Sequence, residues 1–349
     1  MTPLKIGVIG CGYWGPNLIR NFVEIPESDV VVVSDLREAR LAHIRGRYPG
    51  IKTTTDYRDL FSMGLDAVAV ATQPATHYAI AHECLMNDLP VLVEKPLALT
   101  SRDAEELVRL AQLKGLQLLP GHTFEYNPAT RALKKIIQSG ELGQIYYINS
   151  VRANLGLFQR DLNVVWDLAP HDISVLLYLL DMEPVTVGAS GGSYVTHGVQ
   201  DIAYLHLEFP GRIVAHVHVS WLDPCKVRRV TIVGSKKMAV YDDVDPMEKI
   251  KIYDKGVDLP PYTDTFEEFK LSYRYGDVLI PHIQAAEPLR LECEDFVRSV
   301  ADGTAPECTG ESGLEVIRIL EAASRSLNNG GGHELVILEE ALFGEHAHA

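Results

Sequence analysis

The chain opens with Lys5-Ile6-Gly7-Val8-Ile9-Gly10-Cys11-Gly12-Tyr13-Trp14-Gly15, a short apolar run that leads directly into a G-x-G-x-x-G motif. A helical pattern of apolar residues follows at Leu18, Ile19, Phe22 and Val23. Gly10 permits a tight turn after the strand, Gly12 lets the backbone approach a pyrophosphate, and Gly15 lets the helix pack closely on the strand. The free N–H groups at the helix start favour negative charge. We therefore predict a dinucleotide-binding loop here, with Tyr13 and Trp14 beside the cofactor.

An acidic residue stands where such a loop requires one, about 20 residues beyond the motif. It is Asp35, which ends the run Val30-Val31-Val32-Val33-Ser34. A carboxylate at this place binds the ribose hydroxyls and repels a 2′-phosphate, so we predict NAD rather than NADP. Arg37 keeps NADP as an alternative cofactor, because an arginine at that position can accommodate the 2′-phosphate. Asp35 as the N-cap of a helix beginning at residue 38 is compatible with either cofactor.

Strand-like and helix-like segments alternate through residues 1–122. The apolar runs are 6–9, 30–33, 67–71, 91–93 and 116–119, and helical patterns lie near 38–47, 77–87 and 102–114. This alternation predicts a doubly wound parallel sheet, a Rossmann domain of the α/β class. Ligands bind such sheets beyond the carboxyl ends of the strands. The segments that follow the runs are therefore candidate cofactor contacts: Thr72-Gln73-Pro74, Glu94-Lys95-Pro96 and His122.

The pattern changes after residue 122. Strict alternation in Ile202–Phe209 and Arg212–Trp221, with Pro210-Gly211 between them, predicts an antiparallel hairpin. We expect an α+β domain over 123–340, built on a large, mostly antiparallel sheet, and a tail at 341–349. Residues 262–284 show no clear period and predict a long loop.

One strand of this second domain carries a flat, apolar to mixed face. Val214, His216, His218 and Ser220 alternate with the core-facing set Ile213, Ala215, Val217 and Val219. Such a face usually finds a partner, so we expect a homo-oligomer, specifically a tetramer. We predict no metal site at His216 and His218, because no cysteine or glutamate lies at ligand spacing.

Length and composition limit the class of protein. The 349 residues exceed one ordinary core, so two domains are expected. The net charge of −15 argues against non-specific nucleic-acid binding. No apolar run is long enough to span a bilayer, and no signal peptide precedes the first strand. The five cysteines are odd in number and lack a C-x-x-C pair, which favours reduced thiols and a cytoplasmic protein.

Two segments carry candidate proton chemistry. Lys95 follows an apolar strand, so a partly desolvated lysine is expected there, and Glu94 could hold it or meet the nicotinamide side. In isolation, E-K-P is also a common surface turn. Asp167 and His171 lie at i, i+4, where a carboxylate fixes an imidazole for general base work. The alternative is that Asp167 is only the N-cap of a helix, with Pro170 in its first turn, and that His171 is a partly buried histidine.

Taken together, these motifs resemble the Gfo/Idh/MocA oxidoreductase family over essentially the whole chain. The resemblance rests on the glycine motif, Asp35, the segment from Thr72 to His77, Glu94-Lys95-Pro96 and Asp167-x-x-x-His171. It implies that His77 belongs to the cofactor segment and that Lys95 lies beside substrate and nicotinamide. It also implies that His171 is the acid/base histidine and that Asp167 is its partner.

Within the family, segments 121–128, 166–172 and 234–238 look most like the nucleotide-sugar 3-dehydrogenases. Those enzymes oxidise the C3 hydroxyl of UDP-N-acetylglucosamine or its uronic acid in bacterial surface-polysaccharide pathways. The resemblance implies substrate contacts, to hydroxyls or diphosphate, at Asn127, Arg152, Asn154 and Arg160, although each singly could be an ordinary surface residue. Two alternatives stay open: a dehydrogenase of a free polyol such as an inositol, and a cofactor-bound regulatory protein without turnover.

Overall fold

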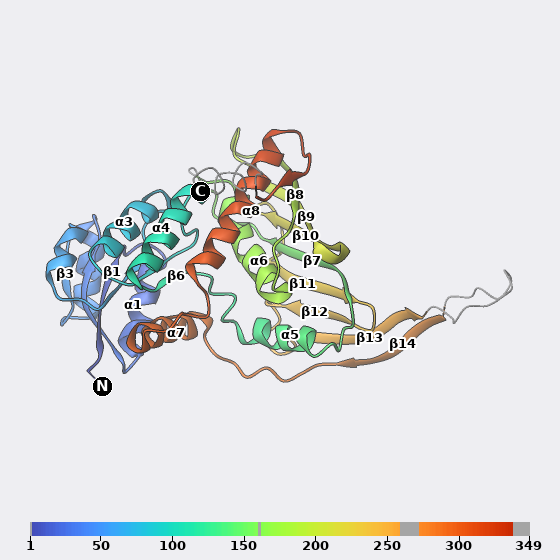
Figure 1. The fold of residues 1–349 in the computed structure, drawn as a ribbon, viewed down its shortest axis with the longest axis horizontal. Coiled ribbons are helices and arrows are strands. Elements are labelled where there is room, and N and C mark those ends of the chain that lie inside the picture. Colours follow the sequence, from blue (N-terminus) through green and yellow to red (C-terminus); the bar gives the residue numbers. More distant parts are fainter. Residues whose placement is uncertain (1, 160–161, 259–271, 338–349) are drawn as a thin grey trace, which may run out of the picture. The chain divides into compact units, whose positions relative to one another are not determined.

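A computed structural model describes residues 2–159, 162–258 and 272–337. The chain divides into two compact units. The first comprises residues 1–127 and 286–318, and the second comprises 128–285 and 319–349. Each unit is built on one β-sheet, as Figure 1 shows.

The first unit contains a fully parallel sheet in the order β3-β2-β1-β4-β5-β6. Its strands are β1 (Leu4–Ile9), β2 (Ser28–Ser34), β3 (Lys52–Thr54), β4 (Ala67–Val70), β5 (Val91–Val93) and β6 (Leu118–Pro120). The helices between them are α1 (Gly15–Glu24), α2 (Glu38–Arg47), α3 (Pro74–Met86) and α4 (Ser101–Lys114), with a short 3-10 segment at Tyr57–Ser62. The predicted Rossmann sheet is therefore confirmed. Only β3 was not predicted, because its sequence is polar.

Apolar patterning explains the local structure of this unit. Ile6 and Val8 of β1 and Leu18 and Phe22 of α1 are fully buried. Val23, predicted on the same helical face, is exposed instead. Burying four such side chains contributes about 1.5–3 kcal/mol each, which fixes α1 on the sheet directly after the glycine motif.

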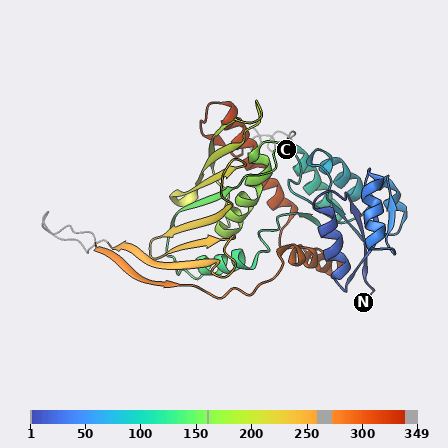
Figure 2. The ribbon, with the colours of Figure 1, turned by 180° about the vertical axis from the view of Figure 1, so that it is seen from behind.

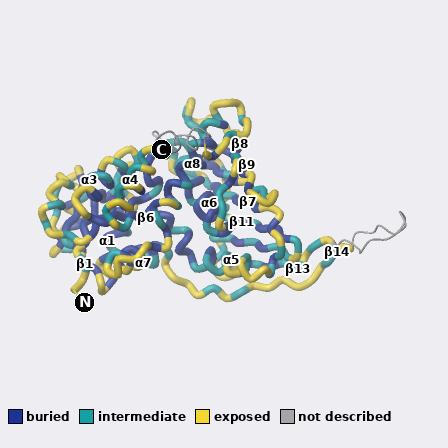
Figure 3. Tube along the Cα trace, viewed as in Figure 1, coloured by how far each residue is buried: buried dark blue, intermediate teal, exposed yellow. Residues whose placement is uncertain are grey.

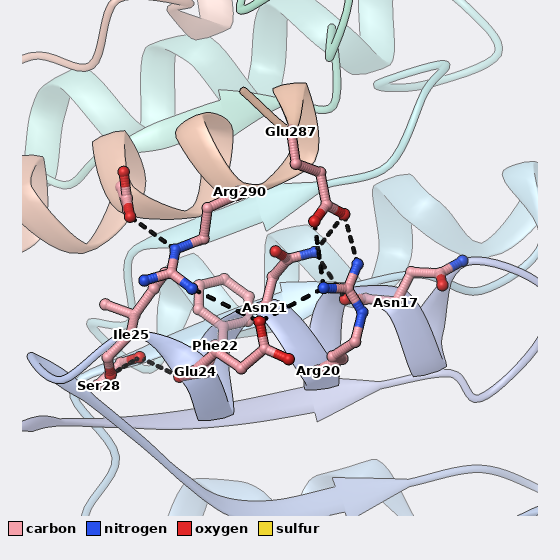
Figure 4. Close-up of polar contacts among 10 residues, drawn as sticks. Asn17, Arg20, Asn21, Phe22, Glu24, Ile25, Ser28, Glu287 and Arg290 are labelled. Atoms are coloured by element: carbon pink, nitrogen blue, oxygen red, sulfur yellow. Dashed lines mark hydrogen bonds and ion pairs between the residues drawn. The ribbon is translucent and has the colours of Figure 1, made fainter. Parts of the chain in front are cut away.

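The chain returns to the first unit at α7 (Pro288–Asp302) and the start of α8 (Gly310–Asn328). Figure 4 shows why α7 lies against α1. Arg20 Nη1 donates to Glu287 at 3.1 Å, and Arg290 forms an ion pair with Glu24 at 3.6 Å. In addition, the ring of Phe22 contacts the ring of Phe296 of α7 edge to face. The predicted boundary at 122/123 therefore misplaces residues 286–318, because a helix pattern carries no sign of which sheet it covers.

The second unit contains a sheet in the order β14-β13-β12-β11-β7-β10-β9-β8-β15. Its strands are β7 (Ile145–Ala153), β8 (Thr186–Gly192), β9 (Ile202–Phe209), β10 (Ile213–Ser220), β11 (Val227–Gly234), β12 (Met238–Asp242), β13 (Ile250–Asp258), β14 (Ser272–Leu279) and β15 (Glu334–Leu335). All described pairs are antiparallel except β7 with β10. The predicted mostly antiparallel sheet is confirmed.

Helices lie along one face of this sheet. They are α5 (Pro128–Gln138) and α6 (Val164–Leu180), and α6 packs on β7, β9 and β10 (Figures 1 and 2). The predicted hairpin of β9 and β10 forms, with Gly211 at φ +76° in its turn. Ala215 and Val217 face the core as predicted, but Ser220, expected on the open face, is buried.

The long loop predicted over 262–284 is wrong for its second half. Residues 272–279 form β14, which pairs antiparallel with β13. Nearly every side chain of β14 is exposed, on both faces of the strand (Figure 3). Tyr273 and Tyr275 do alternate with Ser272 and Arg274, but Gly276 ends this short pattern, and both tyrosines are exposed and pack on no core. Residues 262–271 lie outside the described part of the chain.

Among the helices of the described ranges, none combines the length and the apolar character needed to cross a bilayer.

Candidate active site

The glycine loop after β1 has the geometry of a dinucleotide cradle. Gly10 has φ +100°, and a Cβ there would lie 2.5 Å from the carbonyl oxygen of Ala71. A Cβ on Gly15 would overlap the carbonyl oxygen of Gly10. A Cβ on Gly12 would meet only Arg40 Nη1, at 3.9 Å. Gly10 and Gly15 are thus required for the turn and the helix contact, whereas Gly12 leaves its surface open for a pyrophosphate.

The first turn of α1 is prepared for an anion. Trp14 occupies the N-cap position, and its side chain makes no capping hydrogen bond. The first turn also contains no acidic residue. Tyr13 and Trp14 are exposed beside it, with their rings edge to face at 5.6 Å. The N–H groups and the helix dipole therefore favour a phosphate here, and the loop fits the dinucleotide that the sequence predicts.

Asp35 lies at the carboxyl end of β2 with only 8% of its surface exposed. Its Oδ2 accepts from the Cys11 N–H at 2.7 Å and from Arg40 Nη1 at 3.2 Å, and its Oδ1 accepts from the Arg37 N–H at 2.8 Å. Burial alone would raise the pKa of Asp35, but these donors outweigh it and lower that pKa. Arg37, not Asp35, is the N-cap of α2. The carboxylate is therefore anionic and fixed beside the glycine loop.

His77 of α3 connects two of the predicted cofactor segments. Its ring is buried, with Nδ1 at 2.7 Å from the Pro96 carbonyl oxygen and Nε2 at 3.2 Å from that of Thr72. Burial lowers the pKa of His77, while the two carbonyls act in the opposite direction. Gln73 is the N-cap of α3 and Pro74 is its first residue. The position of His77 supports a role in holding the two loops rather than in touching a ligand.

Glu94-Lys95-Pro96 follows β5, as predicted. Glu94 is 7% exposed, and burial raises its pKa to about 7, with Lys95 opposing that shift. A Cβ on Gly121 would lie 3.2 Å from Glu94 Oε2, so the glycine after β6 leaves room for this carboxyl. The Lys95–Pro96 peptide is cis, and Lys95 is half-buried. Burial thus favours the protonated form of Glu94 next to the candidate catalytic lysine.

A second buried carboxyl was not predicted. Glu292 of α7 accepts from Thr123 Oγ1 at 2.9 Å, and burial followed by the charge of Glu94 raises its pKa well above the ordinary value. Nearby, His122 is buried with Nδ1 at 3.3 Å from Glu125 Oε1. The sequence does carry a signal: Glu292 falls on the apolar face of α7, where Leu289, Cys293 and Phe296 are also buried. An acidic residue on such a face indicates a buried network.

The predicted acid/base pair lies on α6 in the second unit. Asn163 caps this helix, because its Oδ1 accepts from the N–H groups of Val165 and Trp166, both at 3.1 Å. The prediction that Asp167 is the N-cap is therefore wrong; Asp167 lies in the first turn, and Pro170 lies inside the helix. Both Asp167 and His171 are half-buried, and their i, i+4 spacing places them on one face.

Two further contacts order this helix. The Trp221 indole N–H donates to Asp167 Oδ2 at 2.9 Å. Asp172, which the sequence analysis did not select, is buried and accepts from Ser150 Oγ at 2.7 Å and Arg152 Nε at 2.6 Å. Arg152, a predicted substrate contact, is thus held in a buried ion pair between β7 and α6.

The remaining predicted substrate residues lie in different places. Asn127 is buried and is the last residue of segment 1–127, the first of the two segments that form the first unit. Asn154 follows β7 in the second unit, where its N–H donates to the Ser220 carbonyl oxygen at 3.2 Å. Arg160 lies outside the described residues.

Both units contain a segment that matches a known protein family. Residues 4–122 match the oxidoreductase family with an NAD-binding Rossmann fold, and residues 130–240 match the Gfo/Idh/MocA C-terminal domain. UDP-N-acetylglucosamine 3-dehydrogenase of Acidithiobacillus ferrooxidans is 27% identical, over 91% of this chain and 95% of the relative. Inositol 2-dehydrogenase 2 of Saccharopolyspora erythraea is 30% identical, over 62% of this chain and 66% of the relative.

A solved structure shares the fold. GenD2 from gentamicin A biosynthesis, solved in complex with NAD, aligns with a TM-score of 0.81 at 22% identity and covers 97% of each chain. Together with the glycine loop and Asp35, these matches identify the first unit as an NAD-binding domain. The chain belongs to the Gfo/Idh/MocA family of NAD-dependent oxidoreductases.

Proposed function

We propose that this oxidoreductase removes hydride from a secondary hydroxyl, at C3, of a nucleotide-linked sugar such as UDP-N-acetylglucosamine or its uronic acid. One structural observation carries the chemistry. Asp167 is fixed by Trp221 one helical turn before His171, on the same face of α6. The full-length similarity to a UDP-N-acetylglucosamine 3-dehydrogenase supports the substrate class. Bacterial surface-polysaccharide synthesis is the pathway class in which such a product is used.

The residues of this chain have distinct roles in the proposal. NAD, when bound by the glycine loop and Asp35, accepts the hydride. His171 takes the hydroxyl proton as a general base, and Asp167 keeps its imidazole in the required tautomer. The Lys95 ammonium stabilises the developing alkoxide. Arg152 and Asn154 of the second unit and Asn127 of the first unit are the proposed contacts to the substrate.

A free polyol is the second candidate substrate, because an inositol 2-dehydrogenase is 30% identical over part of this chain. A regulatory protein without turnover is disfavoured, since a sensor does not require Lys95, Asp167 and His171 together. The test is a substrate panel at fixed NAD, scored by NADH absorbance and product mass. UDP-N-acetylglucosamine and its uronic acid should turn over, whereas N-acetylglucosamine without the nucleotide should not. Turnover of inositols alone would replace the proposal with the polyol alternative.

Assembly and location are proposed on separate observations. The open face of β10 carries the exposed His216 and the half-buried His218, which supports pairing of that face in a homo-oligomer, specifically a tetramer. All five cysteines lie in the described part of the chain, and none forms a disulfide there. Free thiols fit a reducing cytoplasm.

A further inference from the structure

Histidines gather on the open face of the second unit's sheet, away from the residues proposed for catalysis. His206 on β9 and His216 on β10 are directly opposite each other in the antiparallel register. Glu208 lies two residues further along β9 on the same face, opposite Thr186 of β8. His333 comes from the turn before β15, which pairs with β8. Two neighbouring strands and the segment before β15 thus bring four metal-ligating side chains together.

Three of these side chains converge on one point. His206 Nε2 is 3.6 Å from Glu208 Oε1, and His333 Nδ1 is 3.7 Å from Glu208 Oε2. One ligand atom from each residue lies within 4.8 Å of the others. A zinc ion with bonds of about 2.0–2.2 Å separates its ligand atoms by about 3.3 Å, so closing the triad requires only small side-chain shifts. Three protein ligands leave the fourth position of a tetrahedral ion for water.

Hydrogen bonds from neighbouring side chains orient two of the three proposed ligands. His216 Nε2 lies 2.9 Å from His206 Nδ1, so His206 can donate from Nδ1 and present Nε2 as a lone pair. Thr186 Oγ1 donates to Glu208 Oε2 at 2.8 Å. This hydrogen bond orients the carboxylate.

The absence of a side chain at Gly188 leaves space for the His333 imidazole. A Cβ on Gly188 of β8 would lie 3.2 Å from His333 Cδ2 and 3.3 Å from Nε2. The imidazole thus occupies space that any other residue at position 188 would crowd. The rings of His206 and His333 meet edge to face at 5.1 Å.

We propose that His206, Glu208 and His333 bind one divalent transition-metal ion, with His216 as the positioning residue of His206. Two imidazoles and one carboxylate suit Zn²⁺, Co²⁺ or Ni²⁺ and not Mg²⁺, which requires an oxygen shell. This site was not identified from the sequence because His333 is more than 100 residues beyond His206 and Glu208 in the sequence. Only His216 and His218 of β10 were considered there, and that strand contains no glutamate. It is separate from the proposed dehydrogenase chemistry, which uses no metal.

The test is metal binding to the full-length, tag-free protein after chelator treatment and dialysis. Titration with Zn²⁺, and with Co²⁺ followed by its visible absorption, should give one equivalent per chain, and Mg²⁺ should give none. His206→Ala and His333→Ala should each weaken Zn²⁺ binding by at least about 100-fold, and His216→Ala by about 10–100-fold, the range for an outer-shell partner. Circular dichroism should show that each variant is folded.

Two controls separate this site from other histidines. His218→Ala removes an imidazole on the same face that stacks on Tyr204 and lies outside the triad, so binding should be unchanged. The double change His346→Ala and His348→Ala removes the histidines of the tail and should also leave the equivalent in place. Retention of the bound ion in both His206→Ala and His333→Ala would overturn the proposal. Such an ion would belong elsewhere, for example to the buried group of His122, Glu125 and Cys308.

Discussion

Replacing Glu94 with glutamine should make the stability of the first unit less dependent on pH. Burial raises the pKa of Glu94 from 4.5 to about 7. Below about pH 4.5 the carboxyl is protonated in the folded and the unfolded chain, so it has no effect on the pH dependence. Between about pH 4.5 and 7 the unfolded chain loses the proton first, and the free energy of unfolding therefore falls as pH rises.

The size of the effect follows from the shift. Each pKa unit corresponds to about 1.36 kcal/mol, so 2.5 units give a loss of about 3 kcal/mol by pH 7 in the wild-type chain. Glu94→Gln keeps the shape of the side chain and removes this loss. It also removes the charge that helps to raise the pKa of Glu292, which acts in the same direction.

Urea unfolding of the protein without cofactor, at several pH values from about 4.5 to 7.5, measures this difference. The gap between Glu94→Gln and wild type should shift in favour of the variant by about 3 kcal/mol across that range. Glu27→Gln, at an exposed position, is the matched control and should follow the wild-type curve. A gap that stays constant with pH would show that Glu94 is ionised in the folded chain. The reasoning from burial would then be refuted.

Three further predictions concern cofactor, base and assembly. NAD should bind at least about tenfold more tightly than NADP, because the anionic Asp35 repels a 2′-phosphate; equal affinities in parallel titrations would mean that Arg37 and Arg40 decide the choice. His171→Ala should lose most turnover and recover part of it at high pH, where the substrate hydroxyl ionises more readily, while Asp167→Asn should be milder; equal losses without rescue would argue against a general base. Light scattering at micromolar concentration should give an oligomer mass, and a monomer mass would contradict the pairing of the β10 face.

Much of the fold could be predicted because its signals are local. The apolar run before Gly10 and the helical spacing of Leu18 and Phe22 depend only on neighbouring residues, and both elements formed as predicted. β3 was missed because Lys52–Thr54 is polar, and β14 because both its faces are exposed. In each of these two strands, tertiary pairing overrides the pattern.

The candidate site was predictable only in part, for a related reason. Lys95 and the Asp167–His171 pair follow from their place beside a strand and on a helix. Glu292 could not be associated with Glu94, since nothing local indicates that α7 returns to the first sheet. The capping by Asn163 was also missed, because Pro170 suggested a helix start four residues too late.

The most direct test of the central claim is Lys95→Ala, measured for both turnover of UDP-N-acetylglucosamine and binding of NAD. We predict a loss of several orders of magnitude in kcat, because the charge that stabilises the alkoxide is removed. NAD affinity should change little, since the pyrophosphate is held by the loop from Gly10 to Gly15. Loss of NAD binding with the residual turnover spared would contradict the account and make Lys95 a cofactor anchor.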